Sequence, residues 1–199
     1  MKLFMLHHCP FGHRATIVLQ EKKLAFETVF FQMGQRPPEL EAVGPYAKSP
    51  TLVDGDTKVW DAQIVIEYID DLYPTPSLMP ADAAQRAEVR MLATRVAPEL
   101  FTHLGALVKE VKFKPERDEA KVAEAERGFL DALEGWDRHL KGRKFLVGDA
   151  LSLADVTLYT TFPLIRDLVG TAIPVDRKNL RAWFEHMAAR PTTKLLEPA

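Results

Sequence analysis

The first 73 residues alternate between short apolar runs and stretches with helical spacing. Lys2–Leu6 is a short apolar run that predicts a strand, and from Phe11 to Lys23 the spacing becomes helical. Pro10 suits the first position of that helix, because the backbone N–H that proline lacks would have no partner there. The helix has an apolar face spaced by three or four residues, and a lysine falls in the same series: Ala15, Val18, Leu19 and Lys22.

The rest of this region predicts three more strands and a second long helix. Thr28–Phe31 is β-branched and aromatic, which favours a strand, and Pro37-Pro38 opens a short helix or loop that ends near Gly44. Asp54-Gly55 predicts a tight turn between two further strands. Those strands and the helix after them are Thr51–Val53, Lys58–Trp60 and Asp61–Leu72, which gives the order β-α-β-α-β-β-α.

A proline-rich segment then divides the chain. Tyr73–Pro80 holds three prolines in eight residues, which neither a helix nor a central strand tolerates. We therefore predict a first domain over residues 1–73, a linker over 74–82 and a second domain over 83–199.

Long amphipathic helices dominate the second domain. Ser152–Asp155 has the form of a capping box, with Asp in place of the usual Glu, and begins a helix predicted to run to about Leu168. Another helix is predicted from about Asn179 to Ala189, and the charge-rich stretch 109–127 predicts a solvated helix face interrupted at Pro115. The clearest apolar face consists of Val122, Ala125, Phe129, Leu133, Trp136 and Leu140.

Composition excludes several classes of protein. The chain has 199 residues, is 47% hydrophobic and 27% charged, and carries a net charge of −2, which argues against nucleic acid or an anionic membrane as a partner. No apolar run approaches the roughly 18 residues that span a bilayer. Met1–Leu6 is too short an apolar stretch for a signal peptide. A single cysteine excludes a disulfide framework, so we expect a cytoplasmic protein.

That cysteine, Cys9, is the clearest candidate for chemistry. It stands between the first strand and the first helix, where its thiol can accept hydrogen bonds from the N–H groups of Phe11 and Gly12. The helix dipole favours a thiolate at this place, which predicts a nucleophile, although a single cysteine can also serve as a small core residue. Because Gly12 stands where a second cysteine of a Cys-x-x-Cys motif would be, an external thiol must resolve any disulfide.

Histidines around Cys9 raise the question of a metal site. His7 and His8 are adjacent strand residues, so they point to opposite faces and only one aligns easily with Cys9. No nearby carboxylate or second cysteine completes a tetrahedral shell, and His13 is expected to face solvent or pack, so we predict no metal.

The motifs together resemble the glutathione transferase superfamily over nearly the whole chain. This resemblance implies an α/β thioredoxin-like domain that binds glutathione, followed by an all-helical domain, and a homodimer. It is carried by Cys9–Arg14 at the first helix, by Lys48-Ser49-Pro50 before a strand, by Trp60–Asp70 and by Gly148–Asp155.

Site residues follow from the resemblance position by position. Cys9 matches the catalytic cysteine of the omega-like and dehydroascorbate-reductase-like members, with Phe11 beside it. Ser49, before an expected cis-Pro50, would pair its backbone with the cysteinyl part of glutathione, as an added strand does. Lys48 would approach the glycine carboxylate, unless it is only a surface lysine.

The γ-glutamyl end of glutathione would lie at the start of the helix 61–72. Asp61 and the first N–H groups of that helix would hold it. Ala62 departs from the family, which usually has a serine there whose hydroxyl binds the γ-glutamyl carboxylate. A hydrogen bond to a charged group worth about 1.5–3 kcal/mol is therefore missing.

The function implied is thiol transfer through Cys9, with glutathione as co-substrate and a small disulfide or electrophile as the second substrate. Ordinary conjugation is an alternative. A further one is a non-catalytic RNA polymerase partner, because the segment 67–80 also resembles stringent starvation protein A. Those proteins have Pro-His-Pro where this chain has Pro74-Thr75-Pro76, and they lack the cysteine. Candidates for the second-substrate pocket are Phe101, His103 and Leu104.

Overall fold

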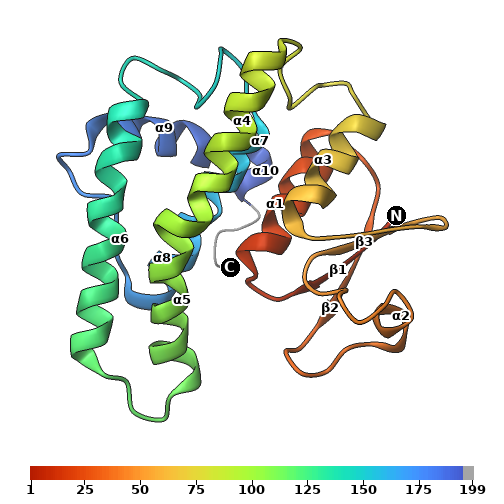
Figure 1. The fold of residues 1–199 in the computed structure, drawn as a ribbon, viewed down its shortest axis with the longest axis horizontal. Helices are drawn as coiled ribbons and strands as arrows, with labels where there is room; N and C mark the ends of the chain where they lie inside the picture. The colour runs from red at the N-terminus through yellow and green to blue at the C-terminus, as the bar shows by residue number, and fades with distance from the viewer. Residues whose placement is uncertain (195–199) are drawn as a thin grey trace. The chain divides into compact units, whose positions relative to one another are not determined.

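The computed structural model describes residues 1–194 and divides the chain into two compact units (Figure 1). The first unit is Met1–Met79, and the second begins at Pro80. The first is built from strands and helices, and the described part of the second is helical, as predicted. No helix within residues 1–194 is long and apolar enough to cross a membrane.

A four-stranded mixed sheet forms the centre of the first unit. Its strand order is β2-β1-β3-β4, with β1 parallel to β2 and antiparallel to β3, and β3 antiparallel to β4. All four predicted strands are present, two of them one residue longer at the start: β1 (Lys2–Leu6), β2 (Glu27–Phe31), β3 (Thr51–Asp54) and β4 (Thr57–Trp60).

Helices cover both faces of this sheet. Successive side chains of β1 point to opposite faces, so each face has apolar side chains to bury. Met5 lies against α1 (Pro10–Glu21), which packs beside α3 (Ala62–Leu72). Phe4 points to the opposite face, where it forms a buried cluster with Leu40 of the short helix α2 (Pro38–Glu41). Figure 1 shows α1 and α3 side by side on one face and α2 on the other.

A buried lysine fastens the proline-rich segment to this unit. The Lys22 Nζ donates to Asp70 Oδ1 at 2.5 Å, to the carbonyl of Tyr73 at 2.6 Å and to the carbonyl of Pro76. Asp70 Oδ1 also accepts the Leu78 N–H at 2.7 Å. Both charged side chains are almost fully buried, so each relies on these bonds for its stability.

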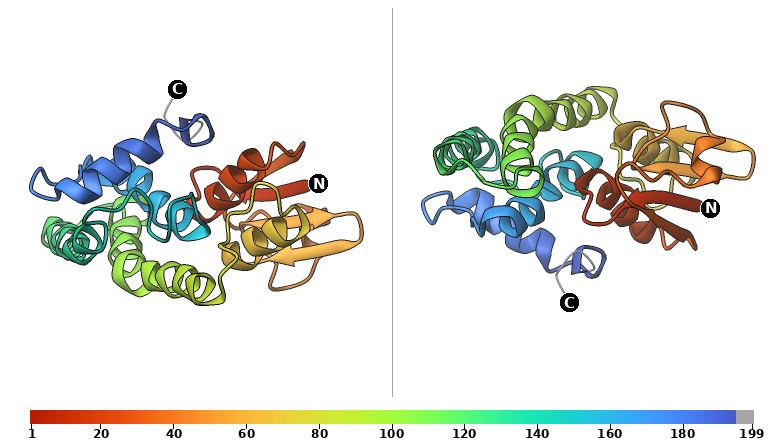
Figure 2. Two further views of the ribbon diagram at one scale, coloured as in Figure 1. Left: turned by 90° about the horizontal axis from the view of Figure 1, so that it is seen from above. Right: turned by 90° about the horizontal axis from the view of Figure 1, so that it is seen from below.

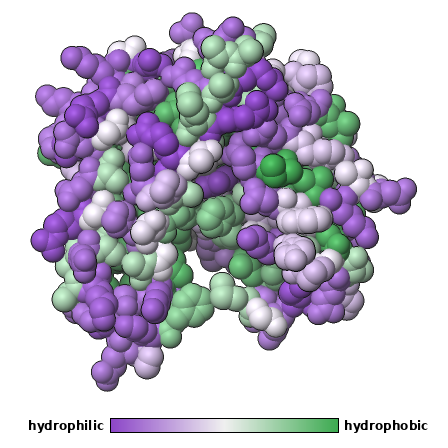
Figure 3. All heavy atoms as spheres, in the orientation of Figure 1, coloured by the Kyte–Doolittle hydropathy of each residue, from purple (hydrophilic) through white to green (hydrophobic). Residues whose placement is uncertain are grey.

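The second unit packs its helices around two fully buried indoles, Trp136 and Trp183. The predicted apolar face of α6 is confirmed: every one of its six residues is buried, and Figure 3 shows hydrophilic side chains along the outer side of this helix. The helical elements are α4 (Ala83–Val96), the π-helical turn η1 (Ala97–Phe101), α5 (Thr102–Val108), the π-helical turn η2 (Lys109–Phe113), α6 (Glu119–His139), α7 (Leu153–Tyr159), α8 (Thr161–Val169), α9 (Lys178–Ala188) and α10 (Pro191–Lys194).

Two predictions about this unit were wrong. The single helix expected from residue 153 to 168 is two helices that meet at Thr160, because Pro163 has no N–H to donate one turn back. The stretch 109–127 is interrupted at Pro115 as predicted, but it is not solvated throughout. Glu110 is only 4% exposed, and its carboxylate pairs with Lys114 at 2.8 Å and accepts the Asp118 N–H at 3.3 Å.

The predicted capping box at α7 holds several elements of the second unit together. Asp155 accepts from the N–H and hydroxyl of Ser152, at 2.9 and 2.7 Å, and from the N–H of Leu146 and the indole of Trp183, both at 2.8 Å. Burial raises the pKa of the Asp155 carboxyl, and these hydrogen bonds oppose that shift. One side chain thereby joins α7, α9 and the loop 140–152.

Candidate active site

The strand register gathers the predicted site residues of the first unit at one edge of its sheet. Phe4 pairs with Thr51, so the register continued outward sets Leu6 opposite Ser49, and the Leu6 N–H donates to the Ser49 hydroxyl at 3.0 Å. Thr51 in turn pairs with Trp60, the residue before Asp61. The end of β1, the start of β3 and the end of β4 therefore meet here.

Cys9 is the N-cap residue of α1 and is partly exposed. Its carbonyl accepts the His13 N–H at 2.9 Å, the first hydrogen bond of the helix. The thiol itself makes no capping hydrogen bond, so the predicted bonds from the N–H groups of Phe11 and Gly12 are absent. A thiol is a weak acceptor, and here the helix supplies its dipole without direct bonds.

Close packing fixes where α1 begins. A methyl group at Gly12 would lie 2.9 Å from the Met5 Cβ and 2.6 Å from its Cε, so only glycine lets the helix approach β1 this closely. Thr16 strengthens the contact, because its hydroxyl donates to the Gly12 carbonyl at 3.3 Å and reaches the Met5 Sδ at 3.6 Å. The position of Cys9 at the end of the sheet follows from this contact.

A buried cation, Arg14, lies one turn into α1. It is only 6% exposed, and its guanidinium carbon is 4.9 Å from the centre of the Phe11 ring, a ring that is itself 36% exposed. Burial lowers the pKa of Arg14 to about 10, against the opposing charges of Asp61 and Cys9. Arg14 is therefore charged at neutral pH, within electrostatic reach of both residues.

Sequence reasoning gave Arg14 no role. The signal was present, since a charged residue sits between Gly12 and the apolar positions of α1. Burial of a cation near a candidate nucleophile is typical of functional sites.

The segment 48–50 enters the site through its backbone. The Ser49–Pro50 peptide bond is cis, as predicted. The Ser49 hydroxyl oxygen accepts the Leu6 N–H, which holds this side chain against β1. Lys48 is exposed, and its carbonyl accepts the Thr51 hydroxyl at 2.6 Å.

Asp61 and Ala62 form the start of α3. Asp61 has a φ of 76°, a conformation that residues with side chains rarely adopt, and it caps the helix: its Oδ1 accepts the N–H groups of Gln63 at 2.9 Å and Ile64 at 3.4 Å. The expected anion site at the first N–H groups is therefore partly occupied by Asp61 itself. The second carboxylate oxygen is not needed for this cap. Ala62 is buried.

The remaining residues that the sequence singled out are His7 in the first unit and His103 and Leu104 in the second. The His7 ring stacks on Phe30 with centroids 4.0 Å apart, and residues 1–194 contain no group of three or more His, Cys, Asp or Glu side chains placed to hold a metal. In the second unit, Leu104 is fully buried and the His103 ring packs against Gly128 of α6. His103 is thus a contact between helices.

Comparison with known proteins gives one consistent family. The model of the glutathione S-transferase N-terminal domain matches residues 3–77, and that of the C-terminal domain matches residues 84–191. Glutathione S-transferase F10 of Arabidopsis thaliana is 31% identical over 191 residues, which cover 91% of this chain and 89% of that protein. Glutathione S-transferase omega-2 of Mus musculus is 28% identical over 195 residues, which cover 96% and 76%.

A solved structure agrees in fold. Ure2p in complex with glutathione superposes with a TM-score of 0.85 at 20% identity, covering 98% of this chain and 97% of that one. An identity this low compares the fold alone.

Proposed function

Because the chain belongs to the glutathione S-transferase family, we propose that it binds glutathione at the sheet edge of its first unit and transfers thiols through the sulfur of Cys9. The observation that carries this proposal is the place of the chain's one cysteine, partly exposed at the N-terminus of α1. A partly exposed thiol at the positive end of a helix is the usual setting of a reactive cysteine.

Glutathione is held along the sheet edge in three parts. Its cysteinyl unit pairs with the main chain of Ser49, which brings the substrate sulfur toward Cys9. Its γ-glutamyl ammonium meets the carboxylate of Asp61, while the γ-glutamyl carboxylate lies at the start of α3 near Ala62. Lys48, exposed at the other end, meets the glycine carboxylate.

Arg14, which is buried one turn into α1, acts on the same proposed glutathione site. Its buried guanidinium lies within electrostatic reach of both Asp61 and Cys9. Mutual attraction at low local dielectric is stronger than at an exposed surface, so one cation supports both the carboxylate that binds substrate and the sulfur that reacts. Arg14 is thus a positioning residue.

The reaction consists of two disulfide exchanges. The Cys9 thiolate attacks the glutathione sulfur of a mixed disulfide, which forms a Cys9–glutathione disulfide and releases the other half as a thiolate that takes a proton from water. A second glutathione, as thiolate, attacks that bond, so that glutathione disulfide leaves and the Cys9 thiolate is restored. Because the chain has no other cysteine, the second thiol comes from outside.

Steady-state kinetics with the mixed disulfide of glutathione and 2-mercaptoethanol test this proposal. Cys9→Ser should abolish thiol transfer, because a hydroxyl is neither ionised at neutral pH nor able to form the disulfide. His7→Gln, an exposed change beside the same strand, should retain it and is the control. Retained transfer in Cys9→Ser, or glutathione conjugation without any thiol transfer in the wild-type chain, would refute the mechanism.

A further inference from the structure

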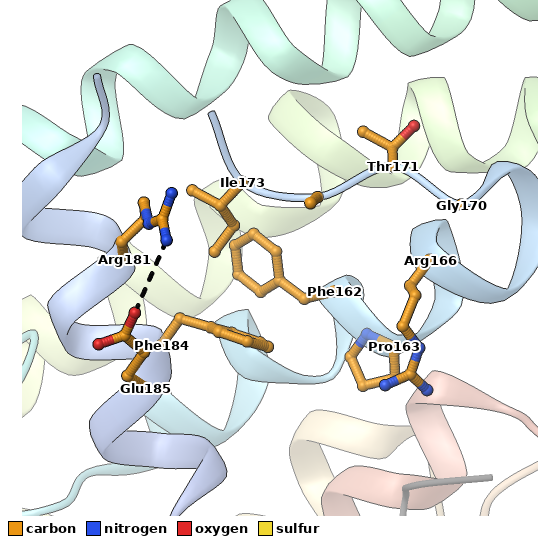
Figure 4. A pocket seen from close by; sticks show the side chains of 10 residues that line it. Phe162, Pro163, Arg166, Gly170, Thr171, Ile173, Arg181, Phe184 and Glu185 are labelled. Carbon is orange, nitrogen blue, oxygen red and sulfur yellow. Dashed lines mark ion pairs between the residues drawn. The ribbon is translucent and has the colours of Figure 1, made fainter. Parts of the chain in front are cut away.

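A cavity of about 310 Å³ lies within the second unit, between α8, the loop 170–176 and α9. Figure 4 shows two phenyl rings, those of Phe162 and Phe184, at its centre, with Arg181 on one side and Arg166 on the other. At ~30 Å³ per water molecule the space holds about ten waters, which matches a ligand of roughly ten to fifteen non-hydrogen atoms. It falls within the size range of small-molecule sites, which begins near 300 Å³.

The walls of this cavity are held in place before any ligand arrives. Gly170 ends α8 with a φ of 74°, and the next residue, Thr171, hydrogen bonds through its hydroxyl to Glu126 of α6. At the other end of the loop, Asp137 of α6 accepts the side chain of Asn179 at 3.0 Å and the N–H of Leu180 at 2.9 Å. Both ends of the loop are therefore tied to α6, and a ligand spends little free energy on ordering them.

The lining is mainly apolar and aromatic. The Phe162 and Phe184 rings meet edge to face, with centroids 5.3 Å apart and planes at 63°, which leaves ring surface for a third aromatic group. Tyr159 stacks behind Phe184 at 5.4 Å and fixes its orientation. Pro163 and Ile173 complete the apolar part. An aromatic ligand suits such walls.

The charged rim favours an anion. Arg181 pairs with Glu185 at 3.9 Å, a distance beyond hydrogen bonding, and its side chain is 41% exposed, so its fork of N–H donors can turn to a carboxylate. Arg166 is more firmly held, because its Nε donates to Asp167 at 2.9 Å. Glu185 opposes an anion from the same side as Arg181, yet the lining holds two guanidinium groups and this one carboxylate, with Arg166 on the other side of the cavity (Figure 4).

We propose that this cavity is a binding site for a small aromatic carboxylate, with its ring against the partly exposed Phe184 ring and its carboxylate on Arg181. The lining contains no cysteine, serine, histidine or lysine, and its one hydroxyl, on Thr171, is committed to Glu126. The proposal is therefore one of binding alone. It shares no residue with the sheet edge of the first unit and is independent of the thiol-transfer proposal.

Isothermal titration with 2-naphthoate tests the site in the full chain saturated with glutathione. We expect one saturable event with a Kd of order 0.1–1 mM. Arg181→Met should raise the Kd about 5-fold or more, and 2-naphthalenemethanol, which lacks the charge, should bind similarly weakly. Glu185→Gln should lower the Kd about 2-fold, because it removes the competing carboxylate.

Arg138→Met is the matched control. Arg138 forms the same kind of exposed pair, with Glu134 at 3.9 Å on α6, but does not line the cavity. Arg138→Met should leave the Kd for 2-naphthoate unchanged. The proposal is overturned if 2-naphthoate does not bind, or if it binds only when glutathione is absent. It is also overturned if Arg181→Met binds 2-naphthoate as tightly as the wild type does, or if Arg138→Met weakens the binding as much as Arg181→Met does.

Discussion

At the start of α3 the chain combines a strained aspartate with an alanine. Asp61 holds a φ of 76° and uses one carboxylate oxygen to cap two N–H groups. Ala62 adds no hydrogen-bonding group. In the proposed binding mode, this helix start presents its dipole and a carboxylate to the γ-glutamyl end of glutathione, without the hydroxyl donor that the resemblance to the family leads one to expect.

Restoring that donor should tighten binding. We predict that Ala62→Ser lowers the Kd for glutathione about 5–30-fold, because one hydrogen bond to a charged group is added within an existing anion site. Isothermal titration measures the change. Asp82 and Ala83 place the same two residue types at the start of α4, where the Asp82 carboxylate accepts the Gln85 N–H at 2.9 Å from an ordinary extended backbone, so Ala83→Ser is the control.

An unchanged Kd in Ala62→Ser would mean that the γ-glutamyl carboxylate binds elsewhere. The same gain in Ala83→Ser would show that the effect is not local.

The residue scale also shows where sequence reasoning ends. The place of Cys9 at a strand-to-helix junction could be read from its neighbours, since Pro10 marks the first helical position. The absence of capping hydrogen bonds to its thiol could not be predicted, because it depends on the direction of the side chain. Arg14 was overlooked for a similar reason. A cation in an amphipathic helix normally faces water, and only the packed structure shows it 6% exposed.

At the scale of elements, α5 and α6 meet closely through a single glycine. A methyl group at Gly128 would lie 2.3 Å from Cε1 and 2.5 Å from Nδ1 of the His103 ring. Seven residues further along the same helix, Gly135 would place its methyl group no closer than 3.8 Å, at the end of the Arg95 side chain. The two glycines thus allow one substitution to be compared in tight and open surroundings.

Alanine at these two positions should have opposite effects. Gly135→Ala should stabilise the second unit by about 0.5–1 kcal/mol, the usual gain within a helix. Gly128→Ala should destabilise it by about 1–3 kcal/mol, since the imidazole must move out of a packed interface. Denaturant unfolding measures both. Adding His103→Ala to Gly128→Ala should recover most of the loss, and failure to do so would place the strain in the backbone.

Elements were predictable where one local rule decided them. The strands, α1, α3 and the apolar face of α6 follow from periodicity, and the Ser152–Asp155 box marks the start of α7. The break at Thr160 was overlooked, although Pro163 is a local signal: a proline is tolerated in the first turn of a helix but not in the interior of the single helix that was predicted. The burial of Glu110 depends on Lys114 and Asp118 together, which a charge pattern alone does not reveal.

At the scale of the whole molecule, one partly buried histidine links stability to pH. His186 of α9 lies edge-on to Phe145, with ring centroids 5.3 Å apart, and its Nε2 is buried without a hydrogen-bond partner in the described structure. Burial, and then the charges of Lys144 and Arg190, lower the pKa of His186, while Asp155 acts in the opposite direction. The folded protein therefore binds a proton at this ring less readily than the unfolded chain does.

The direction of the pH effect on stability follows from the lowered pKa of His186. A lowered pKa in the folded state means that stability is lost as the pH falls below the ordinary histidine value of about 6.5. We predict that the second unit melts at a lower temperature at about pH 5.5 than at about pH 7.5, and that His186→Gln reduces this difference. Calorimetry at both values measures it. His7→Gln, a surface change in the first unit, is the control, and an equal reduction in that variant would contradict the assignment to His186.

We propose that Cys9 exchanges disulfides with glutathione in the folded chain. Mass spectrometry of the native protein after exposure to glutathione disulfide tests it most directly, because the chain has no other cysteine. We predict a single glutathionyl adduct on the peptide that contains Cys9, which disappears when reduced glutathione is added. A native chain that stays unmodified, while the urea-unfolded chain acquires the adduct under the same conditions, would contradict the account.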